Sequence, residues 1–182
     1  SISTSLVPCE YRDHKINILD TPGFADFLGE VRAAVKVADN ALVVVSAVAG
    51  VEVQTEMFWE EAQDLPKVVF VNRMDRENAN FYKTLDDLRD KFSGTIVPLQ
   101  LPIGAEASFK GVVDLLKMKA LIFEPGSGKY KEEEVPADMM ADVESFKEQL
   151  IEAAAEGNDE LLVKYLEGEE LTDEEIRSGI AD

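Results

Sequence analysis

Residues 18–27, ILDTPGFADF, take an apolar run directly into a carboxylate and a Pro-Gly turn. Residues 15–19 are predicted to form a buried strand that ends at Asp20. Residues 2–11 are rich in Ser, Thr and Val, and we expect them to pair with that strand across a turn at residues 12–14. A strand end followed by Pro-Gly is also an ordinary turn, so this segment alone does not identify a site.

Helices and strands alternate after this segment. The expected helices cover residues 27–38, 52–63 and 81–92, and the expected strands cover residues 41–46 and 67–71. Residues 41–46, ALVVVS, are almost continuously apolar, which is typical of a central parallel strand covered on both faces. This order predicts an α/β fold with right-handed βαβ units in an open parallel sheet flanked by helices. Ligands bind beyond the carboxyl ends of such strands, where Asp20 and Asn72 lie.

The pattern of expected elements changes at Gly94. We expect an edge or irregular strand at 96–103, a strand or short helix at 111–116, a loop at 124–134, and helices at 138–155 and 159–167. Thr172 and Glu175 have the spacing of a capping box, which predicts the start of one more helix. We found no internal repeat and no low-complexity linker. Residues 94–182 are therefore predicted to be an α+β insertion packed on residues 1–93.

The charge is concentrated in the last part of the chain. The 182 residues are 46% hydrophobic and carry a net charge of −19, and residues 131–182 hold 18 acidic and 4 basic residues. Such a surface repels a DNA backbone and an anionic membrane, so neither is an expected partner. A basic protein surface is the expected partner, and the alternative is an acidic surface that only confers solubility.

Cys9 is the only cysteine, which excludes an internal disulfide and favours a reducing, cytoplasmic compartment. No run of 18 apolar residues and no signal-peptide pattern is present. Because the sequence starts abruptly at Ser1 without an initiator Met, we expect it to be a fragment of a longer protein.

Asn72-Arg73-Met74-Asp75 follows the strand expected at residues 67–71. An amide and a carboxylate at this spacing can recognise a purine: Asn72 can contact N7 or O6, and Asp75 can accept from two N–H groups of guanine. Adenine would offer only one N–H donor to the two carboxylate oxygens of Asp75, so Asn72 and Asp75 together discriminate against adenine. By the same logic Asp20 can hold Mg²⁺ through a water molecule, and the Gly23 N–H can face a γ-phosphate.

Together these motifs resemble the GTPase domain of ribosomal translation factors, and specifically that of elongation factor G and elongation-factor-G-like proteins. The resemblance covers nearly the whole chain and includes SISTSLVPCEYRDHKINILDTPGFADF, VADNALVVVSAVAGVEVQTE, VVFVNRMD, VPLQLPIG, FKGVVDLLKMKA and LLVKYLEGEELTDEEI. The last three blocks resemble the insertion subdomain that distinguishes elongation factor G from other translational GTPases. The fold implied is a partial P-loop GTPase sheet, residues 1–93, with an insertion subdomain, residues 94–182.

The resemblance also implies roles for individual residues. Ser1 matches the switch I hydroxyl that coordinates Mg²⁺, where the family usually has Thr. Asp20 and Gly23 match the switch II motif, and Asn72 and Asp75 match the guanine motif. Arg73 replaces the usual Lys of that motif, and its guanidinium plane can also stack over the base.

Three departures from the family pattern matter. Phe24 stands where the family has a catalytic His, and it cannot orient a water molecule through a hydrogen bond. His14, in the expected hairpin turn, is interpreted as a solvated loop residue and not as a substitute. The phosphate-binding loop is absent, because residues 126–130, GSGKY, lack its strand context and its hydroxyl for Mg²⁺. The chain also ends before the Ser-Ala-type motif that supports the base.

The resemblance implies that the complete protein binds GTP or GDP with Mg²⁺ and hydrolyses GTP on the ribosome during protein synthesis. The alternative is a GTP-dependent binding switch with weak or no hydrolysis, because Phe24 replaces the catalytic His. The fragment alone is expected to be inactive. The ribosome is the implied partner, and the acidic last part of the chain is expected to contact the ribosomal stalk protein.

Overall fold

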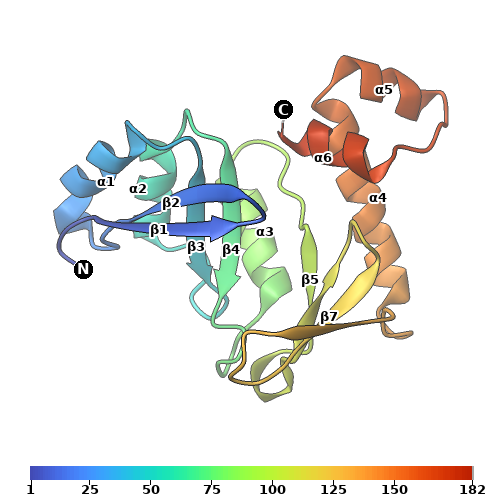
Figure 1. Ribbon diagram of the computed structural model, residues 1–182, viewed down its shortest axis with the longest axis horizontal. Helices are drawn as coiled ribbons and strands as arrows, with labels where there is room; N and C mark the ends of the chain where they lie inside the picture. The colour runs from blue at the N-terminus through green and yellow to red at the C-terminus, as the bar shows by residue number, and fades with distance from the viewer. Residues whose placement is uncertain (182) are drawn as a thin grey trace.

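The computed structural model describes residues 1–181 and arranges them around three separate sheets, as Figure 1 shows. The first part of the chain contains β1 (Ser5–Tyr11), β2 (His14–Asp20), η1 (Ala25–Phe27), α1 (Leu28–Val35), β3 (Ala41–Ser46), α2 (Val53–Glu61), β4 (Lys67–Asn72) and α3 (Phe81–Lys91). The second part contains β5 (Gln100–Ile103), η2 (Glu106–Ser108), β6 (Gly111–Asp114), β7 (Lys119–Phe123), β8 (Tyr130–Glu133), α4 (Met140–Glu156), α5 (Asp159–Leu166) and α6 (Asp173–Ala181). The predicted α/β class, with a small parallel sheet and flanking helices, is confirmed.

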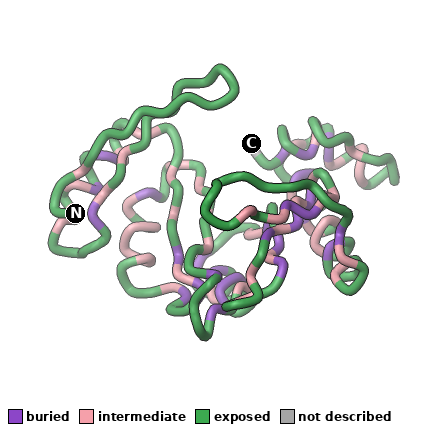
Figure 2. Tube along the Cα trace, turned by 60° about the horizontal axis from the view of Figure 1, so that its bottom comes forward, coloured by how far each residue is buried: buried purple, intermediate pink, exposed green. Residues whose placement is uncertain are grey.

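The expected hairpin is present, with β1 and β2 antiparallel and Ser5 opposite Asp20. The prediction that residues 15–19 are buried is wrong for this chain, because no element within residues 1–181 covers β2 and only Leu19 among residues 15–19 is not fully exposed. Its two-residue turn has positive φ angles at Arg12 (47°) and Asp13 (62°), the geometry that matches the twist of the strands it joins. The hairpin forms a sheet of its own and does not pair with β3. In Figure 2 it stands clear of the rest of the chain and is exposed along almost its whole length.

The parallel sheet consists of β3 and β4, which pair in register from Ala41–Lys67 to Ser46–Asn72. Val45, Leu88 of α3 and Phe92 form a buried cluster on one face of this sheet. On the other face, Leu42, Val44, Val68 and Phe70 are 53 to 64% exposed. The prediction that residues 41–46 are covered on both faces is therefore wrong for this chain, since only one face has helices against it.

The helices α1 and α2 are joined by an ion pair in which Arg32 donates to both carboxylate oxygens of Glu61, over 2.9 and 2.7 Å. This arrangement holds the pKa of Glu61 below its ordinary value, because the hydrogen bonds from Arg32 favour the charged carboxylate. The helix α3 begins at an Asn80 cap whose side chain accepts from Lys83 N. The predicted ranges for these helices are confirmed to within a few residues at each end.

The second part is built on a four-stranded antiparallel sheet in the order β5-β6-β7-β8. Residues 124–134 were predicted to be a loop, and this is wrong because Tyr130–Glu133 forms β8. The strand pairs with β7. Lys117 contacts Glu132 of β8 at 3.2 Å, and Lys119 contacts Glu134, directly after the strand, at 2.5 Å. These ion pairs offset part of the negative charge in and next to the edge strand.

The helices α4, α5 and α6 follow this sheet. Ten buried residues of the sheet, α4 and α6 form the largest apolar cluster in the described part of the chain: Leu101, Ile103, Val113, Leu115, Ala120, Val135, Val143, Leu150, Ala154 and Ile176. The predicted capping box starts α6, with Thr172 N donating to Glu175 Oε2 (2.8 Å) and Glu175 N donating to Thr172 Oγ1 (3.3 Å).

Candidate functional site

Asn72 ends β4, and hydrogen bonds fix its position. Its backbone carbonyl accepts from Ala47 N over 2.8 Å, and its side-chain Oδ1 accepts from Arg73 N over 2.8 Å. Because the Oδ1 atom is engaged in this way, the NH₂ end of the carboxamide is the end that is available to an acceptor. Purine N7 and O6 are acceptors, so this orientation is compatible with the contact predicted for Asn72.

The β4–α3 loop, residues 73–80, presents polar side chains around one buried anchor. Met74 is 6% exposed and lies in an apolar cluster with Ala47 and Ala79, against which Phe81, Ala105 and Phe109 pack. The flanking Arg73 and Asp75 are exposed. Arg73 has a positive φ of 63°, and a bond from Arg76 N to the Arg73 carbonyl closes the turn at 3.2 Å. The buried Met74 thereby directs its two charged neighbours to the surface.

The end of β2 carries the other predicted motif. Asp20 and Gly23 are exposed, while Pro22 between them is fully buried. A Cβ placed on Gly23 would meet no atom within 4 Å, so open space lies beside this backbone. Phe24 is 67% exposed, and its carbonyl accepts from Phe27 N over 3.0 Å at the start of η1. The Phe24 ring can offer no hydrogen bond to a water molecule in this space.

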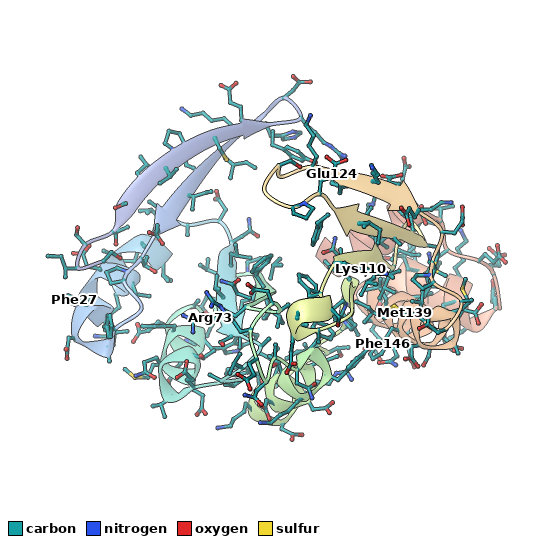
Figure 3. The ribbon with its side chains drawn as sticks, turned by 90° about the horizontal axis from the view of Figure 1, so that it is seen from below. Phe27, Arg73, Lys110, Glu124, Met139 and Phe146 are labelled. Atoms are coloured by element: carbon teal, nitrogen blue, oxygen red, sulfur yellow. The ribbon has the colours of Figure 1, made fainter. Side chains whose placement is uncertain are left out.

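The two motifs lie at the ends of strands in different sheets. Figure 3 shows Phe27, which follows the first motif, well separated from Arg73 of the second. Ser1 is exposed in the segment before β1, and the Thr4 N bond to Glu30 Oε2 (2.7 Å) ties that segment to α1. Asp20 and Asn72 lie at the carboxyl ends of β2 and β4, as we expected, but these strands belong to separate sheets in this chain.

Two surface hollows of this chain are not lined by these motifs. One, of about 390 Å³, lies between the segment after α3 and α4, and the other, of about 440 Å³, lies between α2, Lys67 and the end of α3. The second is bordered by the stacked rings of Trp59 and Phe92, whose centroids are 4.0 Å apart. The predicted site residues Asp20, Gly23, Asn72, Arg73 and Asp75 are themselves all exposed.

The donor groups present fit Mg²⁺ with a bound nucleotide better than they fit a metal held by protein alone. In residues 1–181 no group of three or more His, Cys, Asp or Glu side chains is arranged to hold a metal ion. Mg²⁺ in nucleotide sites keeps several waters and takes one or two protein oxygens together with phosphate oxygens. The exposed carboxylate of Asp20 and the open space beside Gly23 are compatible with that mode.

Two candidates set aside on sequence grounds have other structural roles. Residues 126–129 lie in the turn between β7 and β8, where Gly126 and Gly128 have φ angles of 72° and 67° and the following element is a strand. A phosphate-binding loop instead leads into a helix. His14 is exposed at the start of β2, and its Nδ1 lies 2.8 Å from the Arg12 carbonyl. Neither lies beside the predicted motifs.

The sequence analysis missed one group of contacts around the β4–α3 loop. Asn78 N donates to Glu106 Oε1 over 2.7 Å, and Glu106 N donates to the Met74 carbonyl over 2.8 Å. These bonds join the loop to the turn between β5 and β6. Nothing in the spacing of two residues 28 positions apart could have indicated them.

No helix within residues 1–181 is long and apolar enough to cross a membrane.

The chain is similar to known GTP-binding proteins. Residues 1–175 match the family described as "Elongation factor Tu GTP binding domain". A crystal structure of the protein ttk003000868 from Thermus thermophilus superposes with a TM-score of 0.89 at 39% sequence identity, covering 98% of this chain and 27% of that chain. The chain therefore spans about a quarter of the length of the protein it matches. By the match over residues 1–175, it belongs to the translational GTPases that share the elongation factor Tu GTP binding domain.

Proposed function

We propose that this chain is the central part of the GTP-binding domain of an elongation-factor-G-like protein, which binds and hydrolyses GTP on the ribosome, in the cytoplasm, during protein synthesis. The observation that carries the proposal is the pair of motifs at two strand ends, Asp20–Gly23 after β2 and Asn72–Asp75 at the end of β4, within a chain that matches the GTP-binding family over residues 1–175.

In this proposal Asp75 accepts the two N–H groups of guanine, and Asn72 donates to its N7 or O6. The guanidinium of Arg73 stacks on the base, and the positive φ that turns this residue outward serves that contact. Ser1 and, through a water molecule, Asp20 hold Mg²⁺, and Gly23 N–H donates to the γ-phosphate. Bound Mg²⁺ neutralises charge that develops on the phosphate oxygens. The phosphate-binding contacts come from parts of the protein other than these residues.

Phe24 supports a second candidate function, a GTP-dependent binding switch with weak or no hydrolysis. Its exposed ring stands directly after Gly23, at the family position of the catalytic His. Positioned acid or base groups contribute about 10² to 10⁴ in rate, and a phenyl ring contributes none of this. Under the first candidate, another group, which the ribosome can supply, orients the attacking water.

Single-turnover GTP cleavage by the full-length protein, with and without ribosomes, separates the two candidates. Rapid cleavage with ribosomes supports the GTPase, and cleavage that stays at the level of free GTP supports the switch. Phe24→His is the informative variant, and Phe24→Leu is its control, because Leu also lacks a hydrogen-bonding group. We expect Phe24→His alone to raise the ribosome-dependent rate, by about 10²-fold. Equal rates for both variants would contradict a rate-limiting role of this position.

We further propose that residues 94–182 form the insertion subdomain and that its acidic surface contacts the ribosomal stalk protein. Glu144, Glu148 and Glu152 are all exposed along one stripe of α4, which is compatible with a basic partner. The neighbouring Val143 and Leu150 are fully buried and so are not available for docking. Changing the three glutamates to Lys should weaken stalk binding, whereas Glu132→Gln on β8 should not; unchanged binding of the triple variant would refute the proposed contact.

A further inference from the structure

The β4–α3 loop is attached to the second part of the chain by a single turn, residues 104–110. Two hydrogen bonds cross this junction, and both involve Glu106: its N–H donates to the Met74 carbonyl (2.8 Å), and its Oε1 accepts from Asn78 N (2.7 Å). In Figure 3 the yellow-green η2 turn lies between Arg73 and Lys110. One residue of the second part, Glu106, therefore makes both hydrogen bonds to the loop that carries Arg73 and Asp75, through its backbone and its side chain.

The turn that carries Glu106 is internally fixed. Gly104 has a φ of 78°, and a Cβ there would lie 2.3 Å from the Ser108 carbonyl oxygen, so only glycine fits. The Ser108 hydroxyl donates to the Ala105 carbonyl over 2.7 Å and accepts from Ala105 N over 3.2 Å. Next to the turn, Leu101 and Ile103 of β5 belong to the largest apolar cluster of the described chain. Glu106 thus projects from a well-supported element.

The loop on the other side is held in conformations that need support. Arg73 and Asn78 have φ angles of 63° and 65°, in the left-handed region that residues other than glycine seldom adopt, Asn more readily than Arg. Such conformations persist where surrounding contacts fix them. The Glu106 carboxylate accepts from the N–H of one of these residues, Asn78, and a hydrogen bond to a charged group is stronger than one between neutral groups.

We propose that Glu106 is a positioning residue for guanine recognition: by clamping the β4–α3 loop it fixes Asp75, and through it the insertion subdomain controls how long the nucleotide stays bound. This inference rests on the proposed function of Asn72 and Asp75. The contact to Asn78 is three residues from Asp75, so losing it loosens the C-terminal side of the segment that presents the carboxylate to the base, while Met74 still anchors the other side.

The test uses the full-length protein and the release of fluorescently labelled GDP measured by stopped flow. Glu106→Ala removes the side-chain bond, while Glu106→Gln keeps an oxygen that can accept from Asn78 N. Both variants retain a Cβ and the backbone N–H, so the strain at φ 56° and the bond to the Met74 carbonyl are unchanged. Glu133→Ala is the matched control, because Glu133 is exposed on β8 and its side chain has no hydrogen bond or ion pair within residues 1–181.

We expect Glu106→Ala to release GDP about tenfold faster, the factor equivalent to about 1.4 kcal/mol. Glu106→Gln should speed release less than Glu106→Ala does, because it keeps the hydrogen bond from Asn78 N but loses the charge of the acceptor. Glu133→Ala should remain within about twofold of the unchanged protein because it leaves the clamp untouched. Inosine diphosphate lacks the 2-amino group and offers Asp75 only one donor. The preference for GDP over inosine diphosphate should therefore fall in Glu106→Ala.

Three results would overturn the inference. If Glu106→Ala releases GDP at the rate of the unchanged protein, the clamp does not control retention, and the proposed function still stands. If it weakens GDP and inosine diphosphate by the same factor, the loop is loosened without any effect on base recognition. If the unchanged protein fails to bind GDP at all, the proposed function fails, and this inference fails with it.

Discussion

A close backbone contact between α4 and α6 provides a sharp test of the packing in the second part of the chain. A Cβ added to Gly179 in α6 would lie 2.1 Å from the Ala154 carbonyl oxygen and 2.8 Å from its carbonyl carbon. Gly157, just after α4, faces the same place, since a Cβ there would lie 2.3 Å from the Gly179 carbonyl oxygen. Gly179→Ala therefore forces the two helices apart.

The size of the effect follows from two opposing terms. Overpacking a tight contact costs about 1 to 3 kcal/mol, and the upper end applies here because the obstacle is backbone and cannot rotate away. Replacing Gly by Ala inside a helix stabilises the helix by about 1 kcal/mol, because Ala has the higher helix propensity. The expected net loss is about 2 kcal/mol for the packing of α6, which corresponds to about 30-fold faster opening.

Hydrogen exchange followed by mass spectrometry measures this local opening in the full-length protein. We expect amides of α6 to exchange about 30-fold faster in Gly179→Ala. Gly29→Ala is the control, because a Cβ on Gly29 in α1 meets no atom within 4 Å, and its only effect should be equal or slower exchange of α1. If α6 exchange in Gly179→Ala stays within about twofold of the unchanged protein, the helices do not pack as closely as the structure has them.

Three further predictions concern charge and nucleotide. The pKa of Glu175 is lowered to about 2, mainly by hydrogen bonds from Lys164 and next by those from Thr172. The ionised Glu175 carboxylate therefore stabilises the fold above the ordinary Glu pKa, and this stabilisation is lost as pH falls from about 4.5 towards 2. Thermal unfolding by circular dichroism should show the unchanged protein losing more stability across that window than Glu175→Gln; parallel curves would contradict this. Asp75→Asn in the full-length protein should lower GTP affinity by about 2 kcal/mol or more and improve binding of xanthosine triphosphate, because Asn supplies a donor to the extra carbonyl; calorimetry with both nucleotides decides. The isolated chain should bind GDP no tighter than about millimolar, since none of its segments has the phosphate-binding pattern, and micromolar binding would refute that account.

Local patterns predicted the elements well where burial and periodicity agree. The runs at 41–46 and 67–71 are rich in β-branched and apolar residues, and they form β3 and most of β4, which pair in register. The strand β8 was missed because Lys131–Glu134 reads as a solvated charge run, although lysines at 117 and 119 were available to face the glutamates. The pairing partner of a strand is a long-range property, so the separation of the hairpin from β3 was not visible in local patterns.

Part of the candidate site was likewise predictable from the sequence, and part was not. Residue types and spacing predicted a purine-reading pair at Asn72 and Asp75, because the hydrogen-bonding chemistry of side chains is a local property. The left-handed turn at Arg73 was not predictable, since Arg has no preference for positive φ and adopts it here under the constraint of neighbouring contacts. The clamp by Glu106 depends on the path of β5, which brings a residue 28 positions further along the chain against Asn78.

The apolar clusters on the two sides of the junction differ in size, which bears on their local stability. The cluster of the second part contains ten buried residues, whereas the clusters around Val45 and around Met74 contain three each. Segments with fewer buried apolar contacts open at lower free energy. The β4–α3 loop, anchored by Met74, is therefore the more easily displaced partner, and the turn with Glu106 is the better-supported one. Under the proposed function, a displacement of the turn with Glu106 would therefore shift the β4–α3 loop through the bond from Asn78 N to Glu106 Oε1.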